Sequence, residues 1–153
     1  MPRQIDEETH FINVDLDIYS KSDLDPLVTA LGDQVDVLYI GRPRRTYEAH
    51  LELRYGFKPY NADAMIRRFV ALIGALPKAQ RKLWDTAKTR DFSIGVGAGL
   101  QPFSYEMVLS CEAVEAAAKL NARISFTVYA PEIPNRVVRK SRPSVKSVTK
   151  QES

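Results

Sequence analysis

The sequence predicts an α+β fold in which helices cover one face of a β-sheet. Several short segments alternate apolar and polar residues with a period of two, which is typical of strands with one buried face and one solvated face. Between them lie segments with apolar residues at helical spacing, bounded by residues that start or end helices. The chain has 153 residues, of which 44% are hydrophobic and 27% are charged. This size and composition fit one globular domain.

The first predicted elements are a strand and a short helix. Residues 11–19 place apolar side chains at every second position, so we expect a strand with one buried face and one solvated face. Asp25 followed by Pro26 is typical of a helix N-cap with proline in the first turn. We expect this helix to end at Gly32.

Two further strands and two helices follow. Strands are expected at residues 35–40 and 47–55, and the polar Gly-Arg-Pro-Arg-Arg run between them indicates a hairpin turn. Asn61 is expected to cap a long apolar helix through Leu76. Pro77 then starts another helix, because proline cannot continue the hydrogen-bond ladder of the first.

The last predicted elements are a strand, a helix and a strand. Residues 92–98 and 124–129 alternate as strands do. Between them, Ser104 is expected to cap a helix that runs to Leu120. The expected buried stripe of this helix is Met107, Cys111, Val114 and Ala118.

The predicted order is β-α-β-β-α-α-β-α-β, which contains a split β-α-β arrangement. We therefore expect a two-layer sandwich with a ferredoxin-like sheet and all helices on one face. The other face of the sheet is then open, or is covered by a partner.

Charge divides the chain into a domain and a tail. Residues 131–153 hold six basic and two acidic side chains, a net of +4, whereas the whole chain has a formal charge of +3. This segment also holds three of the nine prolines and no aromatic residue, so it buries too little to offset its ordering entropy. We expect one α+β domain at residues 1–130 and a flexible basic tail at 131–153.

The sequence favours a cytoplasmic protein with no membrane association. Cys111 is the only cysteine, so no internal disulfide can form. The first ten residues lack the apolar core of a secretion signal. Apolar stretches such as residues 69–73 are much shorter than the roughly 20 residues that a membrane-spanning helix needs.

The wet faces of two predicted strands gather ionisable residues. Asp15 and Asp17 lie about 6.6 Å apart along the first strand, and the third strand holds further polar residues at alternate positions. If these strands are neighbours, the open face becomes an acidic patch with one histidine and one arginine. Such a patch is a solvated surface, a docking surface for a basic partner, or a metal or acid–base site. The candidate partner-binding residues are Asp15, Asp17, Glu48, His50, Glu52 and Arg54.

Three other features have a structural interpretation, and the first two also have a functional one. Gly95, Gly97 and Gly99 precede a predicted helix, as in phosphate-binding loops, but glycines at alternate strand positions also let a neighbouring group approach closely. Cys111 is expected to be a buried core residue rather than a nucleophile, since no histidine is close in sequence. Trp84 is expected to pack its helix against the body of the domain.

The basic tail offers an alternative function. Lysine and arginine side chains release counterions when they contact nucleic acid, so the tail could bind it weakly and without sequence specificity. A role in solubility is the favoured alternative, and a localisation signal is a further one. The candidate nucleic-acid contacts are Arg136, Arg139, Lys140 and Arg142.

The segment SKSDLDPLVTALG at residues 20–32, directly after the strand FINVDLDIY, resembles a small bacterial family, domain-of-unknown-function family 4279. Later segments, FSIGVGAG and ISFTVYA, extend the resemblance to roughly residues 10–130. The third strand departs from it, because YEAHLELRY lacks the tryptophan expected there. The resemblance implies an α+β fold, no catalytic residues, and a toxin-immunity or other partner-binding role.

These observations give three functional hypotheses. The first is a non-enzymatic interaction module, immunity-type or other, that docks a basic protein partner on its acidic open face. The second is weak nucleic-acid binding through the tail. The third is a small metal-dependent hydrolase at His50 and its neighbouring carboxylates. No ligand motif of a metal or cofactor matches the sequence, so we expect no cofactor, no metal and no catalytic residue.

Overall fold

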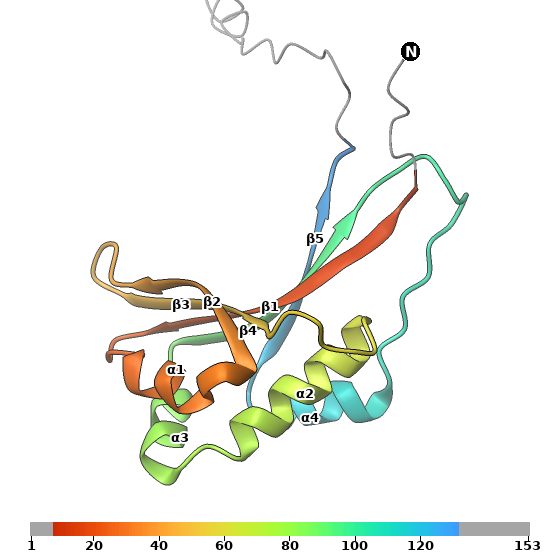
Figure 1. The fold of residues 1–153 in the computed structure, drawn as a ribbon. Helices are drawn as coiled ribbons and strands as arrows, with labels where there is room; N and C mark the ends of the chain where they lie inside the picture. The colour runs from red at the N-terminus through yellow and green to blue at the C-terminus, as the bar shows by residue number, and fades with distance from the viewer. Residues whose placement is uncertain (1–7, 132–153) are drawn as a thin grey trace, which may run out of the picture.

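The computed structural model describes residues 8–131. They form an α+β fold with a five-stranded mixed β-sheet and four α-helices (Figure 1). The predicted α+β class is therefore confirmed. The predicted tail lies outside the described residues, except for its first residue, Pro131.

The order of strands and helices along the chain is the predicted one, with one 3-10 turn added after the first helix. The elements are β1 (His10–Ser20), α1 (Asp25–Leu31), the 3-10 turn Gly32–Gln34, β2 (Val35–Gly41), β3 (Tyr47–Leu53), α2 (Ala62–Gly74), α3 (Lys78–Asp85), β4 (Thr89–Gly97), α4 (Cys111–Lys119) and β5 (Arg123–Tyr129).

The strands lie in the order β2-β3-β1-β4-β5. β1 is central and runs antiparallel to both β3 and β4. β2 and β3 form the predicted antiparallel hairpin, while β5 adds to β4 in parallel. Because β1 and β3 are neighbours, the polar faces of the first and third strands lie side by side.

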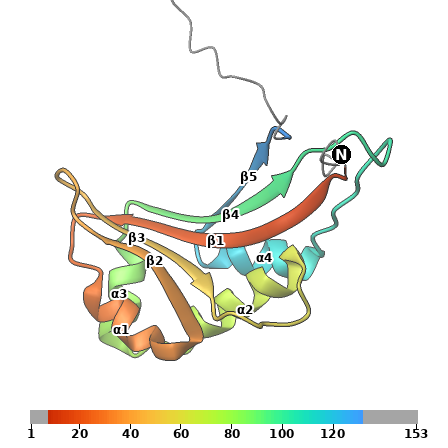
Figure 2. The ribbon, with the colours of Figure 1, turned by 45° about the horizontal axis from the view of Figure 1, so that its top comes forward.

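All four helices lie on one side of the sheet (Figures 1 and 2). Leu16 and Ile18 of β1 are fully buried beneath the helices. Ile66 and Phe69 of α2 are also fully buried. The Phe69 ring stacks on Phe92 of β4 at a centroid distance of 5.8 Å. The opposite side of the sheet, here called the open face, is covered by no helix among residues 8–131.

Side-chain caps fix the start of α2 but not that of α1. The Asn61 side chain accepts a hydrogen bond from the Ala64 N–H at 2.8 Å, as predicted. Asp25 was expected to cap α1 but is its first helical residue. The Asp25 N–H donates a hydrogen bond to Asp23 Oδ1 at 2.9 Å. The N-cap of α1 is Leu24, which makes no side-chain cap hydrogen bond, so the predicted cap at Asp25 is wrong.

The predicted start of the last helix at Ser104 is wrong, and so is the predicted burial of Cys111. α4 begins only at Cys111, which is exposed, and its cap is Ser110. The backbone N–H and the hydroxyl of Ser110 both donate to Asp63 of α2 at 2.7 Å. This contact ties the helix start to α2. The residues that α4 buries are Ala113 and Ala117.

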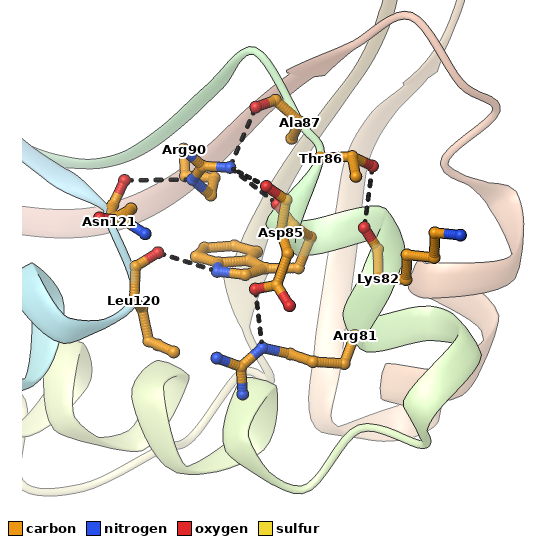
Figure 3. A network of polar contacts seen from close by, with 9 residues as sticks. Arg81, Lys82, Asp85, Thr86, Ala87, Arg90, Leu120 and Asn121 are labelled. Carbon is orange, nitrogen blue, oxygen red and sulfur yellow. Dashed lines mark hydrogen bonds and ion pairs between the residues drawn. The ribbon is translucent and has the colours of Figure 1, made fainter.

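Trp84 anchors α3, so its predicted packing role is confirmed (Figure 3). Its side chain is fully buried, and its indole N–H donates to the Leu120 carbonyl at 3.1 Å. Beside it, the Arg90 guanidinium donates to carbonyl oxygens at the end of α3 and at Asn121. These contacts join α3, β4 and the turn between α4 and β5. Within residues 8–131, no helix has the length and apolar character to span a bilayer.

Candidate functional site

Four carboxylates gather on the open face where β1 and β3 pair. Asp15 lies opposite Glu52 and Asp17 lies opposite His50, while Glu48 is opposite Tyr19. Directly opposed side chains on one sheet face are about 5 Å apart at Cβ, so their charges interact. We call Asp15, Asp17, Glu48 and Glu52 the acidic cluster.

His50 stands between two members of the acidic cluster. Its Nδ1 is 2.7 Å from Asp17 Oδ1, and its Nε2 is 3.2 Å from Glu48 Oε1. Only a protonated imidazole can donate from both ring nitrogens at once. Burial alone would lower the pKa of His50, but the hydrogen bonds to Asp17 and Glu48 and their charges raise it above its ordinary value. Two tyrosine rings flank the imidazole: Tyr19 at 5.6 Å and Tyr39 at 5.9 Å.

The titration of Asp15, a member of the acidic cluster, is strongly perturbed. Partial burial, followed by the charges of Glu52 and Asp17, raises the pKa of Asp15 to about 7. The Asn13 amide donates to Asp15 Oδ1 at 3.0 Å and also donates to Glu52 Oε1. Asp15 therefore exchanges its proton near neutral pH, while Asn13 holds it beside Glu52.

The polar surface continues onto β4 and β5. Asp91 of β4 lies opposite Asp17, and it accepts a hydrogen bond from the Ser125 hydroxyl at 2.8 Å. Arg123 of β5 places its Nε 3.5 Å from the buried Asp91 Oδ1. One row across four strands thus reads His50, Asp17, Asp91 and Arg123. Asp91 was not predicted as a site residue, because the strand was expected to begin at residue 92, although Asp91 is in phase with the polar positions of β4.

Arg54 was expected on the open face, and its ion pair is formed with Asp33 and not with the acidic cluster. β3 ends at Leu53, two residues earlier than predicted. Gly56 then turns the chain with a φ of 92°, a conformation that favours glycine. Arg54 is exposed, and its guanidinium lies 3.7 Å from Asp33 Oδ2. The acidic cluster keeps His50 as its nearest cation.

Glycines in β4 let side chains of β1 lie across the strand. A Cβ at Gly95 would be 3.3 Å from Asn13 Oδ1, and a Cβ at Gly97 would collide with the His10 ring. This supports the close-approach interpretation of these glycines. The next helix, α4, begins only at Cys111. The strand, glycines and helix N-terminus therefore do not form a compact phosphate-binding loop.

The two alternative hypotheses gain no structural support. Among residues 8–131, no group of three or more His, Cys, Asp or Glu side chains is arranged to hold a metal ion. The candidate nucleic-acid contacts Arg136, Arg139, Lys140 and Arg142 lie outside the described part of the chain.

No family model, no curated protein and no solved structure is similar to this chain. The resemblance to domain-of-unknown-function family 4279 therefore stays a prediction.

Two single replacements in the acidic cluster should change stability in opposite directions. The pKa of Asp15 is raised, so ionisation of Asp15 costs stability progressively as pH rises from about 4 through about 7. Asp15→Asn should therefore raise the free energy of unfolding at pH 8 by about 1–2 kcal/mol, after allowance for solvent screening. The gain should vanish at pH 4. Urea unfolding followed by circular dichroism at both pH values measures this.

Asp17→Asn is the matched replacement. The pKa of His50 is raised in the folded protein above its ordinary value of about 6.5. The stabilisation from its contacts is therefore fully present below about pH 6.5 and is lost as pH rises through the raised pKa. Asp17→Asn removes one of these contacts, and we expect a loss of about 1 kcal/mol at pH 6. The same sign of change for both replacements would contradict this account of the acidic cluster.

Proposed function

We propose that this protein is a non-enzymatic interaction module that docks a basic segment of a partner protein on the open face of its sheet. The observation that carries the proposal is the acidic cluster itself. Four carboxylates project from two adjacent strands, and within residues 8–131 no lysine or arginine forms an ion pair with any of them. The protonated His50 side chain forms ion pairs with two of these carboxylates, and it loses its charge as pH rises.

The energetics of the acidic cluster support a surface that awaits a cation. Like charges that lie directly opposite each other on neighbouring strands destabilise a sheet. Neutral polar residues would keep this face soluble without that loss of stability. Burial is the largest cause of the raised pKa of Asp15, and the negative charges of Glu52 and Asp17 raise it further. A lysine or arginine from a partner would relieve this repulsion and would favour the ionised form of Asp15. Complementary charge of this kind mainly raises the association rate.

We propose a ferredoxin-like split β-α-β order for the first four strands. The neighbours β2-β3-β1-β4, all antiparallel, support it, and β5 is then an added parallel edge strand. An immunity-type role, which the family resemblance implies, would be one case of docking a basic partner. The single cysteine supports a cytoplasmic site of action.

An octalysine peptide tests the docking proposal, because it supplies the proposed charge without any other recognition. The double variant Asp15→Asn, Glu48→Gln should bind the labelled peptide about tenfold more weakly than wild type, since two exposed ion pairs contribute up to about 1 kcal/mol each. The loss should lie mainly in the association rate. Stopped-flow fluorescence at low salt measures both rate constants.

The control is the double variant Glu112→Gln, Glu115→Gln, which removes the same charge from α4, a helix on the other side of the sheet. Its affinity for octalysine should stay within about twofold of wild type. Wild-type affinity should also rise between pH 6 and pH 8, as Asp15 gives up its proton. Equal losses in the two double variants would show that octalysine senses net charge alone, and the docking surface would then lie elsewhere.

A further inference from the structure

A groove of about 530 Å³ opens beside the acidic cluster, where β3 ends and the chain turns toward α2. Its walls include the aromatic residues Tyr55, Phe57 and Tyr60, together with Glu52 of the acidic cluster. Small-molecule sites usually have volumes of about 300–1,000 Å³ and mostly apolar or aromatic walls with a few polar groups. The groove has the size and the lining of such a site.

Hydrogen bonds hold the walls of the groove in place. The Tyr55 N–H donates to Asp36 Oδ2 at 2.9 Å, which fixes the turn after β3 to β2. The Tyr60 hydroxyl donates to the Ile12 carbonyl, and its ring lies 5.3 Å from that of Phe11. A groove built on such contacts needs little rearrangement to accept a ligand.

The charges of the groove favour a cation. Glu52 is half-buried, and it lies opposite Asp36 in the pairing of β2 with β3. The two cations of the lining, Arg54 and Lys58, are exposed, and Arg54 is already paired with Asp33. Interactions with half-buried charges are screened less than those with exposed charges. Aromatic ring faces also attract cations rather than anions.

We propose that this groove binds a free organic cation in which an ammonium group is carried on an apolar body, as in an arylalkylamine. The ammonium group pairs with the carboxylate of Glu52, and the apolar body packs against Tyr55, Phe57 and Tyr60. This site goes beyond the proposed docking function. It shares Glu52 with the acidic cluster, but it takes a small molecule and not a protein.

Two probes with the same ring and opposite charge test the proposal on the full, isotope-labelled chain. Tryptamine is a cation and indole-3-propionate is an anion. In NMR titrations at pH 7, tryptamine should shift the backbone amides of residues 52–60, with a dissociation constant on the order of 1 mM for a ligand of this size. Indole-3-propionate should bind at least about fivefold more weakly. Equal binding of both probes would overturn the proposal.

A matched pair of variants locates the ammonium group. Glu52→Gln should weaken tryptamine binding about fivefold, whereas Glu48→Gln, in the acidic cluster but outside the groove, should leave it unchanged. Tyr55→Ala should also weaken it, and Tyr55 as a residue is 95% exposed, so this replacement does not disturb the core. Tryptamine binding that is unaffected by Glu52→Gln would overturn the proposal.

The octalysine peptide separates this site from the docking function. If octalysine fails to bind while tryptamine shifts residues 52–60, the docking function fails and the groove proposal stands, because neither Asp15 nor Glu48 lines the groove. If octalysine binds and shifts residues 52–60 as strongly as tryptamine does, the groove holds a partner's lysine. That result would overturn the free small molecule as its ligand.

Discussion

Replacing Trp84 with alanine should lower the free energy of unfolding by about 3–5 kcal/mol, the usual range for a buried tryptophan. The side chain is 0% exposed and joins α3 to the end of α4 through its hydrogen bond with Leu120. Alanine would leave a cavity and would also remove the donor to that carbonyl. Urea denaturation followed by far-ultraviolet circular dichroism measures the loss without requiring the indole signal.

A second replacement at Trp84 separates packing from hydrogen bonding. Trp84→Phe keeps most of the apolar volume but removes the indole N–H, so the loss should be smaller, about 1–3 kcal/mol. Phe103→Ala is the surface control, because this ring is fully exposed and should contribute less than about 0.5 kcal/mol. A loss of less than 1 kcal/mol in Trp84→Ala would mean that α3 is not anchored by this residue.

Replacing Arg90 with lysine should cost about 2–3 kcal/mol, although the charge is kept. The Arg90 guanidinium donates to four backbone carbonyls at 2.9–3.1 Å: two in the last turn of α3, one at Ala87 just after it and one at Asn121 (Figure 3). A lysine ammonium has no planar fork and cannot reach carbonyls on both sides, so helix-end acceptors lose their partners. Thermal and urea unfolding should both show the loss.

Arg81→Lys is the control for this prediction, since Arg81 belongs to the same neighbourhood but makes only an i,i+4 ion pair with Asp85 at 3.1 Å. Such surface pairs contribute about 0.3–0.5 kcal/mol, and lysine can replace arginine in them. Similar losses at Arg81 and Arg90 would contradict the role given to the four carbonyl contacts.

Local patterns were enough to predict most of the sheet and its polar face. The period-two alternation in β1 and β3 is a direct consequence of side chains that point to opposite faces of a strand. It predicts that Asp15 and Asp17 share one face of their strand and that Glu52 lies on the polar face of another, and the pairing of β1 with β3 brings them together. The Asn61 cap was also predictable from local sequence, because its hydrogen bond closes within the first helical turn.

The errors fall where distant parts of the chain decide the local structure. Ser104 was the expected cap of the last helix, but Ser110 is its cap, and Asp63 binds Ser110 from another helix. No window around residue 110 contains that information. The groove was missed for a related reason. Tyr60 comes to it through contacts with Phe11 and Ile12, residues that are far away in the sequence.

The central place of β1 has a consequence for how the chain is synthesised. The ribosome makes β1 before both of its neighbours, since β3 begins at Tyr47 and β4 only at Thr89. One edge of β1 must therefore wait for most of the domain to be translated before it gains its partner. During that interval its backbone N–H and C=O groups on this side can pair with foreign strands. A nascent chain that stalls before β4 emerges should thus be a prime target for chaperones that shield unpaired strands.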